Sequence, residues 1–295
     1  MNIKLIIMDM DGTLLNAQGV ISQANQRALK AAQDRGIHVG IASGRHPDGL
    51  AKFAKQLAME RHGGYLIGAN GALLVRYPEM ITLFHHTIEP EAIRELFAFG
   101  LHHHIEVMAV HDHTIVDAIP DSMRPLKEAY RQAHHLDAAV PPAAGLYGFI
   151  QDHRVNYPDI HFTHTYDDAF GAANKVCFAH EPDVMDRFVP ALQAAFGDRF
   201  NVMRTAPRWT ELSLTGIDKG SALQEVKGLL GLSEDEIMAF GDGENDIPLF
   251  KACTYGIAMG NAMPKLKENA WAVTTSNNED GIAQALLRFG LISSY

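Results

Sequence analysis

Short apolar runs alternate with longer polar stretches at the start of the chain. The runs over 3–8, 38–42 and 65–69 are largely apolar, which is typical of strands buried on both faces of a sheet. Helices are predicted between these runs, over 23–35 and 47–59. This alternation predicts an α/β fold with a Rossmann-like, doubly wound parallel sheet. Right-handed crossovers would bring the carboxyl ends of its strands to one rim.

The alternation stops in the middle of the chain and then returns. The last part predicts strands over 237–240, 255–259 and 271–274, and helices over 219–230, 247–252 and 280–289. The middle part predicts helices over 89–101 and 182–196, a strand over 175–179, hairpins over 105–116 and 200–214, and a loop over 138–148. We therefore expect one core domain made of 1–86 and 213–295, with 87–212 as an inserted α+β domain.

Composition excludes several classes of protein. The chain has 295 residues, of which 47% are hydrophobic, and a net charge of −10, which argues against a nucleic-acid or membrane-surface protein. Cys177 and Cys253 lie far apart, so neither a disulfide framework nor a thiolate metal site is indicated. The N-terminal apolar run is too short for a signal peptide, and no stretch approaches the length of a membrane helix. We expect a cytoplasmic enzyme.

Polar residues that carry chemistry gather where the predicted strands end. These residues are Asp9 and Asp11 after the first strand, Ser43 and Gly44 after the second, Asp242, Asn245 and Asp246 after the strand over 237–240, and Lys219 just before it. Carboxylates crowded at one rim repel one another and need a cation, and oxygen ligands favour Mg²⁺. Hydroxyl, backbone N–H and lysine donors suit a phosphate. The rim therefore predicts phosphoryl transfer, with one acid as nucleophile and its neighbour as general acid and base.

Four of these segments, in this order, resemble the motifs of the haloacid dehalogenase superfamily. Asp9-Met10-Asp11-Gly12-Thr13 matches the first motif, Ser43 the second, Lys219 the third, and Gly241-Asp242-Gly243-Glu244-Asn245-Asp246 the fourth. The position of the insert, together with Asn70-Gly71-Ala72, Asp218-Lys219-Gly220 and Gly260-Asn261-Ala262 with Lys265 and Lys267, resembles the Cof-type phosphatases with a C2B cap. The resemblance covers the whole core but is loose across the insert.

The resemblance implies a role for each matched residue. Asp9 would be the nucleophile and Asp11 the general acid and base. Phosphate and substrate would be bound by Ser43, Gly44, Lys219, Asn245 and Asn70. Mg²⁺ would be bound by Asp9, the backbone carbonyl of Asp11, Asp242 and Asp246, the last of these directly or through another group. The insert would act as the cap that selects the substrate, a small-molecule phosphate ester.

Several alternatives stay open at this point. Ser43 and Asp246 can serve as helix caps, Asn70 and Asn261 can serve only to shape loops, and Arg45 is expected to be exposed, with a role in substrate binding left open. The histidines, including His102-His103-His104, show no metal-binding spacing and are expected on the solvated surface of the insert. For function we expect a Mg²⁺-dependent phosphatase of small phosphorylated metabolites, sugar phosphates foremost. A phosphomutase and a non-catalytic Mg²⁺- or phosphate-binding regulator are the alternatives, and the oligomeric state stays open.

Overall fold

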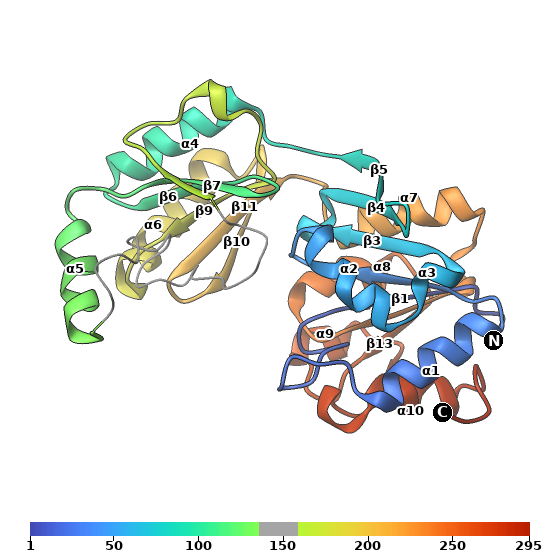
Figure 1. Cartoon of the computed structure of the whole chain (residues 1–295). Helices are drawn as coiled ribbons and strands as arrows, with labels where there is room; N and C mark the ends of the chain where they lie inside the picture. Colours follow the sequence, from blue (N-terminus) through green and yellow to red (C-terminus); the bar gives the residue numbers. More distant parts are fainter. Residues whose placement is uncertain (136–158) are drawn as a thin grey trace. The chain divides into compact units, whose positions relative to one another are not determined.

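The computed structural model describes residues 1–135 and 159–295, which fold into two compact units (Figure 1). The first unit joins the two ends of the chain, Met1–His85 and Ile217–Tyr295, and the second is the segment between them, His86–Gly216. Within the described ranges, no helix combines the length and the apolar character that crossing a membrane requires. The loop expected over 138–148 lies outside the described residues.

The first unit is built on an eight-stranded sheet with the order β14-β13-β12-β1-β2-β3-β4-β5. Its strands span Leu5–Asp9 (β1), His38–Ala42 (β2), Gly64–Gly68 (β3), Leu73–Tyr77 (β4), Ile81–His85 (β5), Ile237–Gly241 (β12), Tyr255–Ala258 (β13) and Ala272–Val273 (β14). All pairs from β14 to β3 are parallel, which confirms the predicted doubly wound sheet. The register pairs Met8 with Phe240, so β1 and β12 end beside each other.

Two strands at one edge of this sheet were not predicted. Both β4 and β5 run antiparallel to their neighbours. The residues of β5 are exposed or only half-buried. A strand in such a position does not need the continuous apolar run that marks the central strands. The predicted doubly wound sheet is therefore extended by an antiparallel hairpin.

Helices precede, connect or follow the parallel strands of the first unit. They are α1 (Gln23–Asp34), α2 (Pro47–Gln56), α3 (Met59–His62), α7 (Lys219–Leu230), α8 (Ile247–Lys251), α9 (Pro264–Glu268) and α10 (Gly281–Arg288). The helix predicted over 47–59 begins at Pro47 as expected but ends at Gln56, because Ala58 takes a left-handed conformation (φ 58°) that separates α2 from α3. Asp218 caps α7 by accepting a hydrogen bond from the Ser221 N–H at 2.8 Å, which fixes the turn before Lys219.

The second unit holds a six-stranded sheet with the order β10-β11-β9-β6-β7-β8. Its elements are α4 (Pro90–His102), β6 (Glu106–Val110), β7 (Thr114–Ala118), α5 (Arg124–Ala133), β8 (Asp159–Phe162), β9 (Lys175–Ala179), α6 (Pro182–Phe196), β10 (Phe200–Ala206) and β11 (Trp209–Leu214). Both predicted hairpins, β6–β7 and β10–β11, are antiparallel as expected. Successive residues of β6 belong to two separate apolar clusters, because strand side chains alternate between the two faces of a sheet.

Candidate active site

The site begins where β1 ends, in the first unit. Asp9 is the last residue of β1 and is 7% exposed. Asp11 follows two residues later, and Gly12 (φ +84°) turns the chain. A Cβ atom at Gly12 would lie 2.3 Å from the Asp242 Oδ2 atom. The glycine therefore meets two needs at once: a left-handed backbone and room for a carboxylate from the end of β12.

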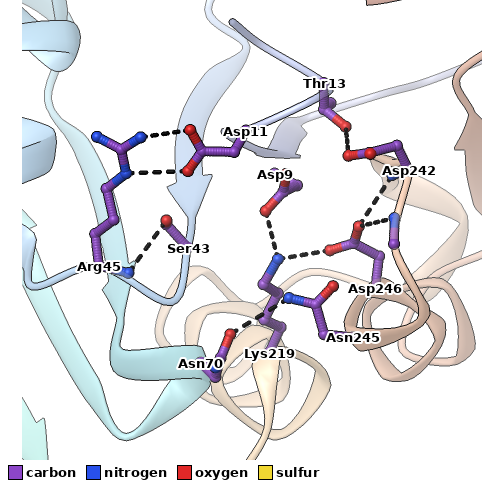
Figure 2. Close-up of polar contacts among 11 residues, drawn as sticks. Asp9, Asp11, Thr13, Ser43, Arg45, Asn70, Lys219, Asp242, Asn245 and Asp246 are labelled. Atoms are coloured by element: carbon purple, nitrogen blue, oxygen red, sulfur yellow. Dashed lines mark hydrogen bonds and ion pairs between the residues drawn. The ribbon is translucent and has the colours of Figure 1, made fainter. Parts of the chain in front are cut away.

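Lys219, the first residue of α7, is fully buried between two carboxylates (Figure 2). Its Nζ atom donates to the Asp9 Oδ1 atom at 2.5 Å and to the Asp246 Oδ1 atom at 2.7 Å. The lysine thus joins the carboxyl end of β1 to the segment that follows β12. A fully buried lysine is rare in proteins unless its charge is paired, as it is here.

Asp246 uses both of its carboxylate oxygens within the protein. While Oδ1 accepts from Lys219, Oδ2 accepts from the backbone N–H groups of Asp242 and Gly243, each at 3.0 Å. The Asp246 side chain is also completely buried. It therefore fixes the backbone that carries Asp242 as well as the position of the lysine.

The charges at this site are unbalanced. Burial raises the pKa of Asp9 to about 8; the Lys219 ammonium opposes this rise, and the Asp246 carboxylate adds to it. Burial also raises the pKa of Asp242, against a hydrogen bond from Thr13 that lowers it. Burial alone would lower the pKa of Lys219, but Asp246 and Asp9 outweigh it and raise that pKa. One lysine therefore faces three carboxylates, and a further cation would relieve their repulsion.

The donor set fits a hard divalent cation. One oxygen from each of Asp9, Asp242 and Asp246 lies within 4.8 Å of the others. All three groups are carboxylates, the kind of oxygen donor that Mg²⁺ prefers. The Asp242 Oδ1 atom accepts a hydrogen bond from the buried Thr13 hydroxyl at 2.9 Å, which orients this carboxylate. Thr13 was not singled out from the sequence, although it directly follows the Asp-Gly turn.

The residues expected to bind phosphate lie on the neighbouring strand ends. Ser43 directly follows β2 and is buried. A Cβ atom at Gly44 would lie 3.2 Å from the Asn70 Oδ1 atom, so these two residues are in close contact. Asn70 is left-handed (φ 54°), and its side chain accepts a hydrogen bond from the Asn245 amide at 3.4 Å. Ser43, Gly44, Asn70 and Asn245 are thus brought together along one edge of the site.

Two contacts of the Asp9–Thr13 segment were missed from the sequence. The Asp11 carboxylate is paired with the Arg45 guanidinium (Figure 2). On the other side, the Asn261 amide donates to the Gly12 carbonyl at 2.8 Å, so Asn261 does more than shape its own loop. Arg45 had a signal: it follows Ser43-Gly44 directly and is a cation beside a rim rich in carboxylates. The contact of Asn261 spans 249 positions and has no local signal.

The sequence profile of the haloacid dehalogenase-like hydrolases matches residues 6–286, which is nearly the whole chain. The chain belongs to this family.

Individual proteins similar to this haloacid dehalogenase-like hydrolase cover at least 90% of it. It is 30% identical over 272 residues to the HMP-PP phosphatase of Serratia proteamaculans, covering 90% of this chain and 86% of that protein. It is also 30% identical over 298 residues to the chloroplastic endoribonuclease YBEY of Arabidopsis thaliana, of which it spans only 46%. A crystal structure of a haloacid dehalogenase-like hydrolase from Bacteroides thetaiotaomicron has 27% identity and a TM-score of 0.74, with 97% of this chain and 99% of that chain covered.

These similarities confirm three of the predictions from the sequence: the superfamily with its Cof-type phosphatases, the fold class, and a phosphatase as the kind of enzyme.

Proposed function

We propose that the chain is a Mg²⁺-dependent phosphatase that hydrolyses small phosphorylated metabolites, with sugar phosphates as its substrate class, through a phosphoaspartyl intermediate. The contact of Asp9 with Lys219 carries this proposal, because it sets a carboxylate at a strand end beside a buried cation. Asp242 adds a second carboxylate, and Ser43 and Gly44 add phosphate donors on the adjoining strand end. Such a set suits transfer of a phosphoryl group to a carboxylate.

In the first step the Asp9 carboxylate attacks phosphorus and the bond to the leaving-group oxygen breaks. Asp11, as general acid, gives a proton to that oxygen, and the alcohol departs. Lys219, Ser43 and the Gly44 N–H hold the oxygens of the phosphoryl group and stabilise the charge that they gain. Asn245 and Asn70, which contact each other, orient the phosphate and the substrate.

In the second step water attacks the phosphorus of the phosphoaspartyl group. Asp11, now a carboxylate, takes the proton from the water, and the bond to Asp9 breaks to release inorganic phosphate. Asp9 is again a carboxylate and Asp11 again carries its proton, so the net reaction is hydrolysis of a phosphate monoester. The exposed position of Asp11, whose side chain is 58% accessible, allows this proton exchange with the leaving group and with water.

The acidic cluster is the proposed metal site. Asp9, Asp242 and the backbone carbonyl of Asp11 would hold Mg²⁺, and the ion when bound would offset the repulsion between a phosphate and the carboxylates. Asp246, with both oxygens already bonded, would act through Lys219 and through the backbone at 242–243. The inserted unit, 87–212 in the expected division, would supply the contacts that select the substrate.

An ester panel tests this function. Purified protein with Mg²⁺ is given sugar phosphates, other small phosphate monoesters and an RNA oligonucleotide, and free phosphate is measured together with the organic product. Free phosphate from sugar phosphates that disappears with EDTA supports the proposal. An isomerised sugar phosphate without free phosphate means a mutase, and no turnover of any ester means a non-catalytic binding protein.

A further inference from the structure

Arg45 and Asp11 form a bidentate ion pair in the first unit (Figure 2). The Arg45 Nε atom donates to the Asp11 Oδ2 atom at 3.0 Å, and Nη2 donates to Oδ1. A guanidinium that contacts both oxygens of a carboxylate fixes its direction as well as its distance. These two contacts are the only hydrogen bonds of the Asp11 side chain within the described part of the chain.

The backbone of Arg45 is itself held firmly. Its N–H donates to the Ser43 Oγ atom at 3.2 Å, and its carbonyl accepts from the Ala69 N–H at 2.9 Å. A Cβ atom at Gly68 would lie 2.9 Å from the same carbonyl oxygen, so β3 passes directly against this turn. The turn that presents Ser43 therefore also fixes the point from which the arginine reaches Asp11.

The ion pair contributes little to the stability of the folded protein. The Asp11 side chain is 58% exposed and that of Arg45 is 22% exposed, and exposed ion pairs typically contribute less than about 1 kcal/mol. Its effect on geometry is larger, because an exposed aspartate without a partner samples several side-chain rotamers. A proton carrier that is misplaced by about 1 Å can lose about 100-fold in rate.

We propose that Arg45 is a positioning residue for Asp11: it contacts both oxygens of the carboxylate that takes a proton from water, and it keeps one contact when the other oxygen carries the proton for the leaving group. This inference rests on the proposed role of Asp11 as general acid and base. In this scheme Arg45 affects the rate only through Asp11. A direct contact between Arg45 and the substrate is not needed for catalysis. The alternative, direct binding of the substrate by Arg45, is an outcome that the tests below separate.

The first test compares two leaving groups in R45A and R45K. The ratio kcat/KM reports the steps up to departure of the leaving group, which needs a proton when it is a sugar alkoxide and hardly needs one when it is p-nitrophenolate. R45A should lower kcat/KM for a sugar phosphate about 10- to 100-fold, mostly in kcat, and should change it little for p-nitrophenyl phosphate. R45K should keep more activity than R45A but less than the wild type, because lysine lacks the planar guanidinium that contacts both oxygens of Asp11.

The second test asks whether the two residues act as a unit. In a cycle of D11N, R45A and the double variant, the double variant should lose no more activity than D11N alone. Millimolar guanidinium should restore part of the activity of R45A but none of that of D11N, and urea at the same concentration should restore neither. R76A, at an exposed arginine on β4, serves as the control and should keep full activity and no guanidinium response.

The possible results distinguish the positioning role of Arg45 from the proposed phosphatase mechanism. A rise in KM for both substrates with kcat unchanged, or losses that add in the double variant, would mean that Arg45 binds substrate and would overturn the inference. A severe loss in D11N beside an unaffected R45A would also overturn it while leaving the proposed function standing. Full activity in D11N, with Mg²⁺ dependence intact, would instead remove the role of Asp11 and the proposed mechanism with it.

Discussion

Each unit buries a lysine among acidic side chains, but the two clusters differ. In the first unit Lys219 lies between Asp9 and Asp246. In the second, the Lys127 Nζ atom contacts the buried Glu106 carboxylate at 2.5 Å. The third member there, Asp117, is completely buried, and neither of its carboxylate oxygens has a hydrogen-bond partner among the described residues.

The two clusters differ in how their surplus negative charge can be neutralised. The first cluster sits at the carboxyl ends of parallel strands, where Asp242 is half-buried and a cation can enter. The second sits on adjoining antiparallel strands, β6 and β7, with fully buried carboxylates. There a proton removes the surplus charge most readily: burial and the charge of the neighbouring Glu106 raise the pKa of Asp117 well above its ordinary value, although Lys127 and Arg124 oppose this. We therefore expect a cation at the first cluster, where the strands end at a rim, and a buried proton at the second.

The largest expected effect is that of D9N. Asparagine keeps the shape of Asp9 but cannot form the phosphoaspartyl group, so phosphate release should fall by at least about 10⁴-fold. Thermal unfolding should show that the fold is kept, because one of three crowded carboxylates has been neutralised. D117N neutralises the corresponding acid of the second unit and should keep its activity. Substantial turnover by D9N would remove Asp9 as nucleophile.

Lysine removal compares the two clusters directly. K219M leaves Asp9 and Asp246 buried without the lysine between them and should cost about 3–5 kcal/mol of unfolding free energy, measured by urea denaturation. K127M removes the contact of Lys127 with the buried Glu106 and should also lower the unfolding free energy. K219M should also abolish phosphatase activity, and K127M should not do so directly. The two losses differ because only the first lysine contacts the proposed nucleophile.

The response to added Mg²⁺ should differ between K219M and K127M. Added Mg²⁺ should raise the melting temperature of K219M by more than that of the wild type, because the carboxylates freed from the lysine bind the cation more strongly. For K127M the Mg²⁺-induced shift should equal that of the wild type. A larger shift in K127M would mean that the cluster of the second unit also takes up a cation, and the distinction between the two clusters would fail.

A smaller effect is expected from T13V. Valine keeps the shape of Thr13 but removes the hydroxyl that donates to Asp242, and loss of such a supporting contact weakens metal affinity about 10-fold or more. The Mg²⁺ concentration for half-maximal activity should rise by this factor, with kcat at saturating Mg²⁺ little changed. T82V, at an exposed position on β5, is the matched control and should leave the Mg²⁺ titration unchanged. An unchanged titration in T13V would show that Asp242 needs no orienting group.

The sequence predicted best what depends on neighbouring residues. The strands β2 and β9 and the helices α6 and α7 lie where they were expected, because apolar runs and caps are local signals. The same local signals placed Asp9, Lys219 and Asp242 at strand or helix ends that the parallel sheet brings to one rim. The strand β5 and the helix α5 were missed, since both are largely exposed and lack an apolar run.

What could not be predicted depends on side-chain rotamers and on distant contacts. The pairing of Arg45 with Asp11 requires that both side chains turn toward each other, which no spacing specifies. That Asp246 has both oxygens bonded follows from a tight turn, in which the backbone of 242–243 folds over the carboxylate. The buried acids of the second unit gave no signal either, because Glu106 and Asp117 stand in strands whose other residues look ordinary.

A further effect is expected on the pH dependence of stability, through D117N. Because the pKa of Asp117 is raised in the folded protein, the folded state holds a proton that the unfolded state releases above the ordinary value of 3.8. Wild-type stability should therefore fall as the pH rises from 3.8 through the raised pKa, by up to about 1.4 kcal/mol per pH unit for one proton. D117N should lack this fall and should exceed the wild type in stability at the alkaline end, as measured by urea denaturation across pH.

An exposed acid provides the control for that pH series. D198N changes a carboxylate of the same unit that lies on the surface, and it should follow the wild-type profile. If D117N also follows that profile, the folded protein holds no extra proton at Asp117, and the charge of the second cluster must be balanced in the way proposed for the first, by a cation. Repeating the series with Mg²⁺ and with EDTA then decides the matter: a buried proton gives a profile that is the same in both, whereas a bound cation gives a profile that EDTA shifts.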